Sequence, residues 1–233
     1  EWKYVKECLD TSWVSSAGKY VDLFEEKIAE YTGAKYGVSV NSATSALHLA
    51  CLALELGKGD ILWTTPITFV ASANCAIYCG AKVDFVDIDP ATGNLSLKAL
   101  KKKLKQAQRE KRLPKVIAPV HFAGLPCDMP ALHKLACEFG FQILEDAAHA
   151  FMGKYKNQFL GTIGDLGAFS FHETKNIVAG QGGALSINNK KFEKRAKIIL
   201  DKGTDKSISY NKKKYYSWKG MGSEYRAPEL TAA

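Results

Sequence analysis

Residues 36–56, YGVSVNSATSALHLACLALEL, decide the fold of this chain. A β-rich run over residues 36–40 predicts a strand, and the Ala- and Leu-rich run over residues 44–56 predicts a helix. The residues where the two runs meet are small: Asn41, Ser42, Ala43 and Thr44. Backbone N–H groups at such a helix start bind anions, assisted by the helix dipole. A simple Ser/Thr helix cap is the alternative interpretation.

The same alternation of strand and helix patterns continues along the chain. Further strands are predicted at residues 61–65, 82–88, 115–120, 141–144, 167–171 and 184–187. Further helices are predicted at residues 21–31, 69–78, 95–109, 129–139 and 192–201, and another begins at 228. Strands that alternate with helices predict an α/β protein with a mainly parallel sheet covered on both faces. No internal repeat or low-complexity linker divides residues 1–233, so we expect one domain.

The composition is that of an ordinary globular protein. The chain has 233 residues, of which 46% are hydrophobic and 24% are charged, and its mean hydropathy is −0.16. These values exclude a collagen, a disordered tail and a disulfide-stabilised mini-protein. No apolar run approaches the roughly 18 residues of a membrane span, and Glu1, Lys3 and Lys6 leave no signal peptide visible. We therefore expect a cytoplasmic protein without a membrane partner.

The net charge of +8 lies largely in two basic stretches, residues 101–115 and Lys212–Lys214. The first stretch fits a solvated helix face and the loop that follows it. The aromatic residues near the second stretch, Tyr210 among them, match no RNA-binding motif, so we expect no nucleic-acid partner, although charge alone leaves polyanion binding open. The six cysteines form no C-x-x-C pair, which predicts reduced, buried thiols and no metal site.

Ligands of parallel α/β sheets gather where the strands end, so residues after each strand are candidates. Asp146 follows one strand, where a carboxylate is costly unless it meets a cation; a structural ion pair or helix cap is the alternative. Lys175 precedes a Gly-rich turn and is either an ordinary exposed lysine or a Schiff-base lysine, whose desolvated amine attacks carbonyls. With a phosphate-binding helix start and the Ser-x-His stretch at Ser170, these are the parts of a pyridoxal 5'-phosphate (PLP) site.

The chain resembles the DegT/DnrJ/EryC1/StrS group of sugar aminotransferases, PLP enzymes of the aspartate aminotransferase fold type. The matching segments occur in the family order and cover essentially the whole chain. They are residues 13–18 (WVSSAG), 41–47 (NSATSAL), 65–71 (TPITFVA), 119–124 (PVHFAG), 145–150 (EDAAHA), 169–176 (FSFHETKN) and 180–184 (GQGGA). The resemblance implies a three-layer α/β/α structure with a mainly parallel central sheet, the large domain of fold type I.

The resemblance also implies a role for each matching residue. Lys175 resembles the catalytic Schiff-base lysine, which also carries the substrate proton. Asp146 resembles the catalytic partner of the pyridine nitrogen. The remaining cofactor-binding residues are implied to be Ala43, Thr44, Phe69, His149 and Ser170. Ala43 and Thr44 would bind the phosphate through their backbone N–H groups, and Ser170 would bind it as well. Phe69 would stack on the ring, and His149 would lie beside it.

The implied reaction is transamination of a nucleotide-linked 4-keto-6-deoxy sugar in bacterial surface-glycan biosynthesis, with glutamate as amino donor and a homodimer as the active assembly. Lys175 favours transamination over the dehydratases of this family, which carry histidine there. The first half of the chain favours a UDP-N-acetylhexosamine derivative, and the second half favours dTDP-4-keto-6-deoxyglucose. A 3-aminotransferase and an inactive, truncated PLP-fold domain are further alternatives.

Two positions depart from the family pattern. Glu224 stands where members often carry asparagine close to the phosphate of the neighbouring subunit's cofactor, and a carboxylate there would repel phosphate unless it points away. Gln181 stands where glutamate is usual. Residues 1–233 are expected to form the PLP-binding large domain, with the family's small C-terminal domain absent.

Overall fold

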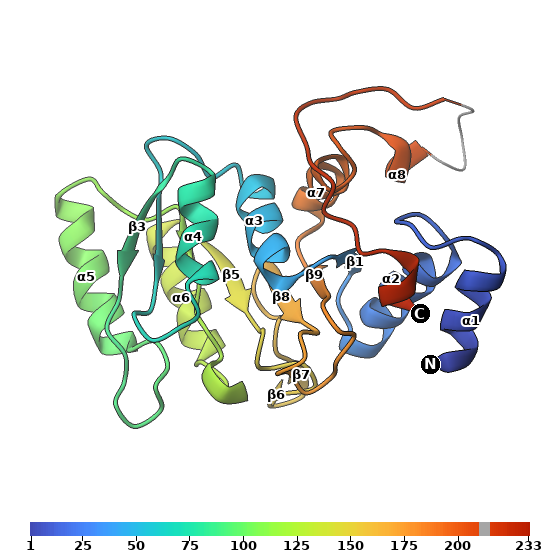
Figure 1. Cartoon of the computed structure of the whole chain (residues 1–233). Coiled ribbons are helices and arrows are strands. Elements are labelled where there is room, and N and C mark those ends of the chain that lie inside the picture. Colours follow the sequence, from blue (N-terminus) through green and yellow to red (C-terminus); the bar gives the residue numbers. More distant parts are fainter. Residues whose placement is uncertain (210–214) are drawn as a thin grey trace.

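The computed structural model describes residues 1–209 and 215–233. A seven-stranded sheet with strand order β1-β9-β8-β5-β4-β2-β3 forms its centre (Figure 1). The strands are β1 (Tyr36–Val40), β2 (Ile61–Thr64), β3 (Lys82–Phe85), β4 (Val116–Ile117), β5 (Gln142–Asp146), β8 (Leu166–Ser170) and β9 (Gly183–Ile187). Strand β9 runs antiparallel to β1 and β8, whereas every other neighbouring pair is parallel. The predicted mainly parallel sheet is confirmed.

Helices cover both faces of the sheet because the strand side chains alternate in direction. In β5, Leu144 packs into the core formed with α3 (Ala43–Ala53), α4 (Ala71–Tyr78) and α7 (Glu193–Leu200). Its neighbour Ile143 packs into the opposite core. The helices on that opposite side are α5 (Leu97–Arg109) and α6 (Met129–Phe139), with α2 (Lys19–Thr32) packed against the β8–β9 end. The three-layer α/β/α architecture is therefore confirmed.

Some element boundaries differ from the prediction for local reasons. Strand β4 is shorter than the predicted 115–120 because Pro119 has no N–H to donate to a neighbouring strand. Helix α4 begins at Ala71, which leaves Phe69 outside it. The sequence analysis missed α1 (Trp2–Asp10), which buries little except Cys8. It also missed the small hairpin of β6 (Lys154–Tyr155) and β7 (Gln158–Phe159).

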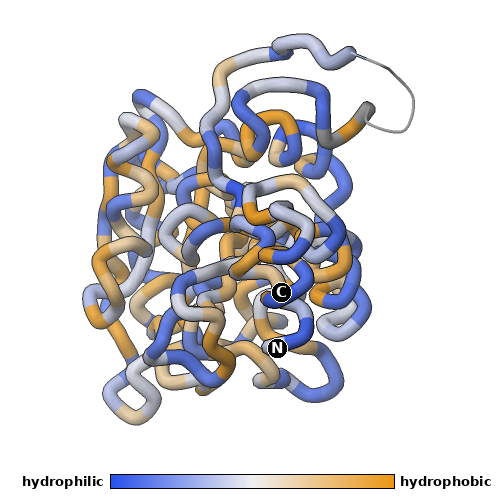
Figure 2. The backbone as a smooth tube through the Cα atoms, turned by 45° about the vertical axis from the view of Figure 1, so that its right-hand side comes forward, coloured by the Kyte–Doolittle hydropathy of each residue, from blue (hydrophilic) through white to orange (hydrophobic). Residues whose placement is uncertain are grey.

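The last described helix, α9 (Glu229–Ala232), packs against the N-terminal part of the chain, and the chain ends lie close together in Figures 1 and 2. The Glu229 carboxylate accepts the backbone N–H groups of Tyr20 and Val21, each at 2.8 Å. Glu229 is 1% exposed, so a buried carboxylate caps the start of α2 from more than 200 residues away. The expected helix start near residue 228 is confirmed.

The surface features of the sequence are accounted for only in part. Helix α5 buries Leu100 and Leu104 and exposes Lys101, Lys102 and Lys105, so the first basic stretch is a solvated helix face as predicted. The second stretch, Lys212–Lys214, and Tyr210 lie outside the described residues. All six cysteines are free thiols, but Cys137 is exposed, contrary to the expectation of burial. Across the described ranges, none of the helices has the length and apolar character to cross a membrane.

Candidate active site

The start of α3 offers backbone donors to an anion. Ser42 is the N-cap, and its Oγ accepts the N–H of Ser45 at 3.1 Å. Ala43 and Thr44 supply the first two N–H groups of the helix, which have no acceptor within the helix itself. The helix dipole places positive potential at the same point. The cap interpretation and the anion-site interpretation are therefore compatible, because the Ser42 cap takes the third N–H and not the first two.

The ends of β8 and β9 pack directly on this helix start. Ser170 ends β8 and is in register with Gly183 of β9. A Cβ at Gly183 would lie 2.5 Å from the carbonyl carbon of Ser42 and 2.6 Å from the nitrogen of Ala43. Only glycine permits this approach, and the neighbouring residue across the strand pair, Ser170, is 6% exposed. The sequence assigns Ala43, Thr44 and Ser170 to one phosphate cradle, and that assignment stays a prediction.

A lysine, a carboxylate and a histidine influence one another electrostatically at and beyond the end of β5. Asp146 ends this strand and is 4% exposed, and Lys175 lies in the loop that follows β8. Partial burial lowers the pKa of the Lys175 amine, and the nearby Asp146 carboxylate opposes that shift. The pKa of His149 is lowered by partial burial and by repulsion from Lys175. The charges of Lys175 and Asp146 therefore influence the pKa of His149, and the charge of Asp146 influences the pKa of Lys175.

Phe69 lies in the loop between β2 and α4 with its side chain 71% exposed. An aromatic face left open in this way is available to a flat ligand. The prediction put Phe69 inside a buried helix, and that placement is wrong, because α4 begins two residues later. The exposed position suits the predicted stacking role better than burial would.

Glu145, next to Asp146, has a structural role. Its carboxylate is 0% exposed and meets four donors: His121 Nε2 (2.8 Å) and the backbone N–H groups of Gly161 (2.8 Å), Ile163 (2.7 Å) and Gly164 (2.5 Å). His121 Nδ1 accepts the N–H of Cys127, so the ring proton on Nε2 is the one donated to Glu145. All four donors belong to the protein, so the Glu145 carboxylate stabilises the loop of residues 161–164 and the His121 ring.

Ser72 is a site residue that sequence reasoning missed. It is 0% exposed in the first turn of α4, and its Oγ lies 2.6 Å from Asp146 Oδ2. The second oxygen, Oδ1, accepts the N–H of Ala148 at 3.1 Å. The available signal was a polar side chain on the apolar, buried face of a predicted helix, since such a group needs a partner.

Glu224, the departure from the family pattern, is engaged by a lysine. Lys202 forms an ion pair with its carboxylate, and the contact raises the pKa of Lys202. Ser16 Oγ lies 3.3 Å from the other carboxylate oxygen. The negative charge of Glu224 is therefore countered within the chain. Gln181, the second departure, is exposed in the loop before β9, and nothing in the structure explains this substitution.

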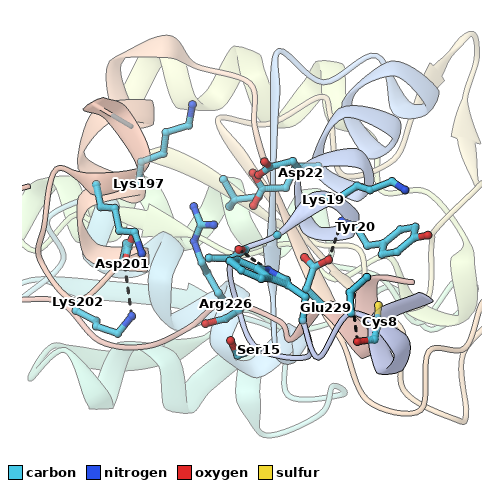
Figure 3. Close-up of a pocket in the computed structure, with 18 of the residues that line it drawn as sticks. Cys8, Ser15, Lys19, Tyr20, Asp22, Lys197, Asp201, Lys202, Arg226 and Glu229 are labelled. Atoms are coloured by element: carbon cyan, nitrogen blue, oxygen red, sulfur yellow. Dashed lines mark hydrogen bonds and ion pairs between the residues drawn. The ribbon is translucent and has the colours of Figure 1, made fainter. Parts of the chain in front are cut away.

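A cavity of about 950 Å³ lies between the start of α2, α7 and the segment before α9 (Figure 3), and Ser16 and Lys202 are among its lining residues. None of the predicted site residues lines it. Several of its charged side chains are engaged within the protein: Glu229 caps α2, and Glu7 pairs with Lys19 at 2.6 Å and accepts the Tyr20 hydroxyl at 2.7 Å. The cavity is therefore separate from the candidate active site.

Comparison with known proteins agrees with this geometry. The family model described as "DegT/DnrJ/EryC1/StrS aminotransferase family" matches residues 1–233. The chain belongs to this family. Its members use PLP, and solved aminotransferases share the mainly parallel sheet described above.

Three relatives illustrate the range of the DegT family. GDP-perosamine synthase of Caulobacter vibrioides is 35% identical over 100% of this chain and 60% of the relative. UDP-4-amino-4,6-dideoxy-N-acetyl-beta-L-altrosamine transaminase of Campylobacter jejuni is 37% identical over 94% of this chain and 56% of the relative. The solved PLP-form of Spr1654 from Streptococcus pneumoniae has 26% identity and a TM-score of 0.84, covering 99% and 61%. The chain thus spans about 60% of the length of such relatives.

The residues present fit PLP. The cradle of Ala43, Thr44 and Ser170 suits a phosphate, since backbone N–H groups and a hydroxyl are its usual donors. The buried Asp146 carboxylate suits a protonated pyridine nitrogen. Lys175, whose amine pKa is lowered, suits covalent attachment, and the exposed Phe69 ring suits a flat heterocycle. Within the described ranges, no group of three or more His, Cys, Asp or Glu side chains is suited to hold a metal ion.

Proposed function

We propose that this protein is a PLP-dependent aminotransferase that transfers an amine to a nucleotide-linked 4-keto-6-deoxy sugar. The observation that supports the proposal is the electrostatic influence of the buried Asp146 carboxylate on Lys175, whose amine pKa is lowered by partial burial. A lysine with a lowered pKa, a buried carboxylate and a phosphate cradle are the three fixed points of a PLP site. Residues 1–233 then constitute the cofactor-binding large domain.

Each side chain has a task in this reaction. When bound, PLP supplies an electron sink for negative charge at the amine-bearing carbon of the substrate. Asp146 would stabilise a proton on the ring nitrogen, and Ala43, Thr44 and Ser170 would bind the phosphate. Lys175 would hold the cofactor through its Nζ and, once released, would act as the base and acid for the substrate proton. Phe69 would lie against the ring face and His149 beside the ring.

The substrate class follows from the resemblance and from the names of relatives. We favour a UDP-N-acetylhexosamine-derived 4-keto sugar, in line with the UDP-altrosamine transaminase. The alternative substrate is dTDP-4-keto-6-deoxyglucose. A relative named for a GDP sugar adds a nucleotide that the sequence analysis did not consider. Glutamate as donor, a homodimer, a cytoplasmic location and a role in bacterial surface-glycan biosynthesis complete the proposal.

The test combines spectroscopy with product analysis. The purified protein is incubated with PLP and its visible absorbance is recorded. It is then incubated with glutamate and UDP-, dTDP- or GDP-4-keto-6-deoxy sugars, and the products are identified by mass. We expect a bound-cofactor absorbance and an amino-sugar product with a UDP substrate. Lys175→Ala should lose both signals, whereas Lys58→Ala, at an exposed loop lysine, should retain both. Normal turnover by Lys175→Ala would contradict the proposal.

A further inference from the structure

The hydroxyl of Ser72 lies at the centre of a buried hydrogen-bond chain. Its Oγ is 2.6 Å from Asp146 Oδ2, 2.7 Å from Thr68 Oγ1 and 3.1 Å from the carbonyl oxygen of Phe69. A serine hydroxyl has one proton to donate. The carboxylate is the strongest and nearest acceptor, so the proton of Ser72 goes to Asp146. The Thr68 hydroxyl then donates to Ser72, which gives the chain Thr68 to Ser72 to Asp146 a single direction.

This chain fixes the orientation of the Asp146 carboxylate. Ser72 holds Oδ2 from the α4 side, and the N–H of Ala148 holds Oδ1 at 3.1 Å. With a donor on each oxygen, the carboxyl plane cannot rotate freely about its Cβ–Cγ bond. A hydrogen bond to an ionised group is about twice as strong as one between neutral groups. The bond from Ser72 is therefore the stronger restraint, as its shorter distance also indicates.

The same hydroxyl ties Asp146 to the loop that carries Phe69. Thr68 and Ser72 flank the exposed ring in sequence, and the Phe69 carbonyl accepts the backbone N–H of Ser72 at 3.1 Å. A ligand that stacks on Phe69 and pairs with Asp146 would therefore contact two residues that are both linked to Ser72 by hydrogen bonds. A change at Ser72 would then alter the contact with the ring nitrogen directly and the contact with the ring face only through the loop.

We propose that Ser72 is a positioning residue that aims the Asp146 carboxylate at the ring nitrogen of bound PLP. The inference rests on the proposed function, because it needs PLP in the site. Beyond that function, the strength of the contact between Asp146 and the ring nitrogen would depend on the Ser72 hydroxyl of α4, which itself would touch neither cofactor nor substrate.

A cofactor analogue with CH in place of the ring nitrogen separates positioning from a structural role. Affinities for PLP and for this analogue are measured for the unmodified protein and for Ser72→Ala. Unmodified protein should prefer PLP, and we expect Ser72→Ala to reduce that preference by about tenfold, since a charge-assisted hydrogen bond is lost. The pH dependence of the bound-cofactor absorbance should also change. A purely structural role would weaken both ligands equally and leave the preference intact.

Two further variants keep the test decisive. Thr68→Val preserves shape but removes the donor to Ser72, and should reduce the preference in the same direction by a smaller factor. Ser39→Ala makes the same chemical change at a buried serine of β1 whose Oγ has no hydrogen-bond partner within the described residues, and should leave the preference unchanged. An unchanged preference in Ser72→Ala would overturn this assignment alone. No PLP binding by unmodified protein would overturn the proposed function and this assignment with it.

Discussion

Glu145 and Asp146 are adjacent carboxylates at the end of β5 with opposite surroundings. Glu145 points to the same side as Ile143 and is enclosed by His121 and the loop of residues 161–164. Asp146 points to the α4 side, where it meets Ser72 and lies near Lys175. The alternation of side chains along a strand is enough to separate them. One carboxylate uses its oxygens to hold the protein together, and the other has capacity left for a ligand.

The comparison predicts that Asp146→Asn separates activity from stability. The amide no longer compensates the positive charge of a protonated ring nitrogen, so turnover should fall by about 100-fold or more. The fold should persist, because the amide oxygen can accept the N–H of Ala148 while the NH2 group donates to Ser72 Oγ, whose own proton can turn to the Phe69 carbonyl 3.1 Å away. The free energy of unfolding should therefore change by about 1 kcal/mol or less. Steady-state kinetics with glutamate and a keto sugar, together with urea unfolding, measure the two quantities. Near-normal turnover would contradict the electron-sink role of Asp146.

Glu145→Gln should show the reverse pattern. Four donors surround Glu145, and the NH2 group of glutamine would face at least one of them without an acceptor. Leaving buried donors unsatisfied should lower the free energy of unfolding by about 2–4 kcal/mol. Urea unfolding followed by circular dichroism measures this loss. Glu26→Gln, at an exposed position of α2, is the matched control and should be nearly neutral. Equal stability of the two variants would show that the Glu145 network is unimportant.

Glu229 is a third buried carboxylate, and it allows the starts of two helices to be compared. The start of α2 is closed by Glu229, whereas the start of α3 keeps the N–H groups of Ala43 and Thr44 for a ligand. Glu229→Gln retains one acceptor for the two N–H groups and removes the charge that favours the helix dipole. We expect a loss of about 1–2 kcal/mol in the free energy of unfolding, with PLP affinity unchanged. Weaker PLP binding in this variant would show that the two helix starts are coupled.

Local signals explain what the sequence could predict. The bounds of α6 follow from its own residues, since Asp128 caps the start through the N–H of Ala131 and Gly140 ends it with a positive φ. Likewise, β1 matches its predicted range of residues 36–40 because its β-rich run is short and bounded. Lys175 and Asp146 were found as residues that follow strands and match a family motif.

Contacts between distant segments explain what the sequence could not predict. Ser72 acts on Asp146 from 74 positions away, and Lys202 meets Glu224 through a bridge between two loops. Neither partner is visible from spacing or composition. The role of Glu145 was also hidden, because a carboxylate beside a predicted site residue looks the same whether it binds a ligand or a loop. Only the folded structure therefore shows which side chains pair when they are far apart in the sequence.

The smallest expected effect concerns the pH at which Lys175 becomes reactive. Its pKa is lowered by partial burial, so its neutral, nucleophilic form is available at lower pH than for an ordinary lysine. The rate of covalent PLP attachment should therefore rise with pH through a midpoint below that of free lysine. The Asp146 carboxylate favours the charged amine and raises this pKa. Asp146→Asn should consequently move the midpoint to still lower pH.

Glu145→Gln provides the matched control for this pH measurement. Its carboxylate belongs to the other side of β5 and does not contribute to the shift in the pKa of Lys175. The midpoint for this variant should therefore stay where it is in the unmodified protein. Stopped-flow absorbance across a pH series measures all three midpoints. A midpoint that moved to higher pH in Asp146→Asn, or that moved equally in both variants, would contradict the assignment of the two carboxylates to separate tasks.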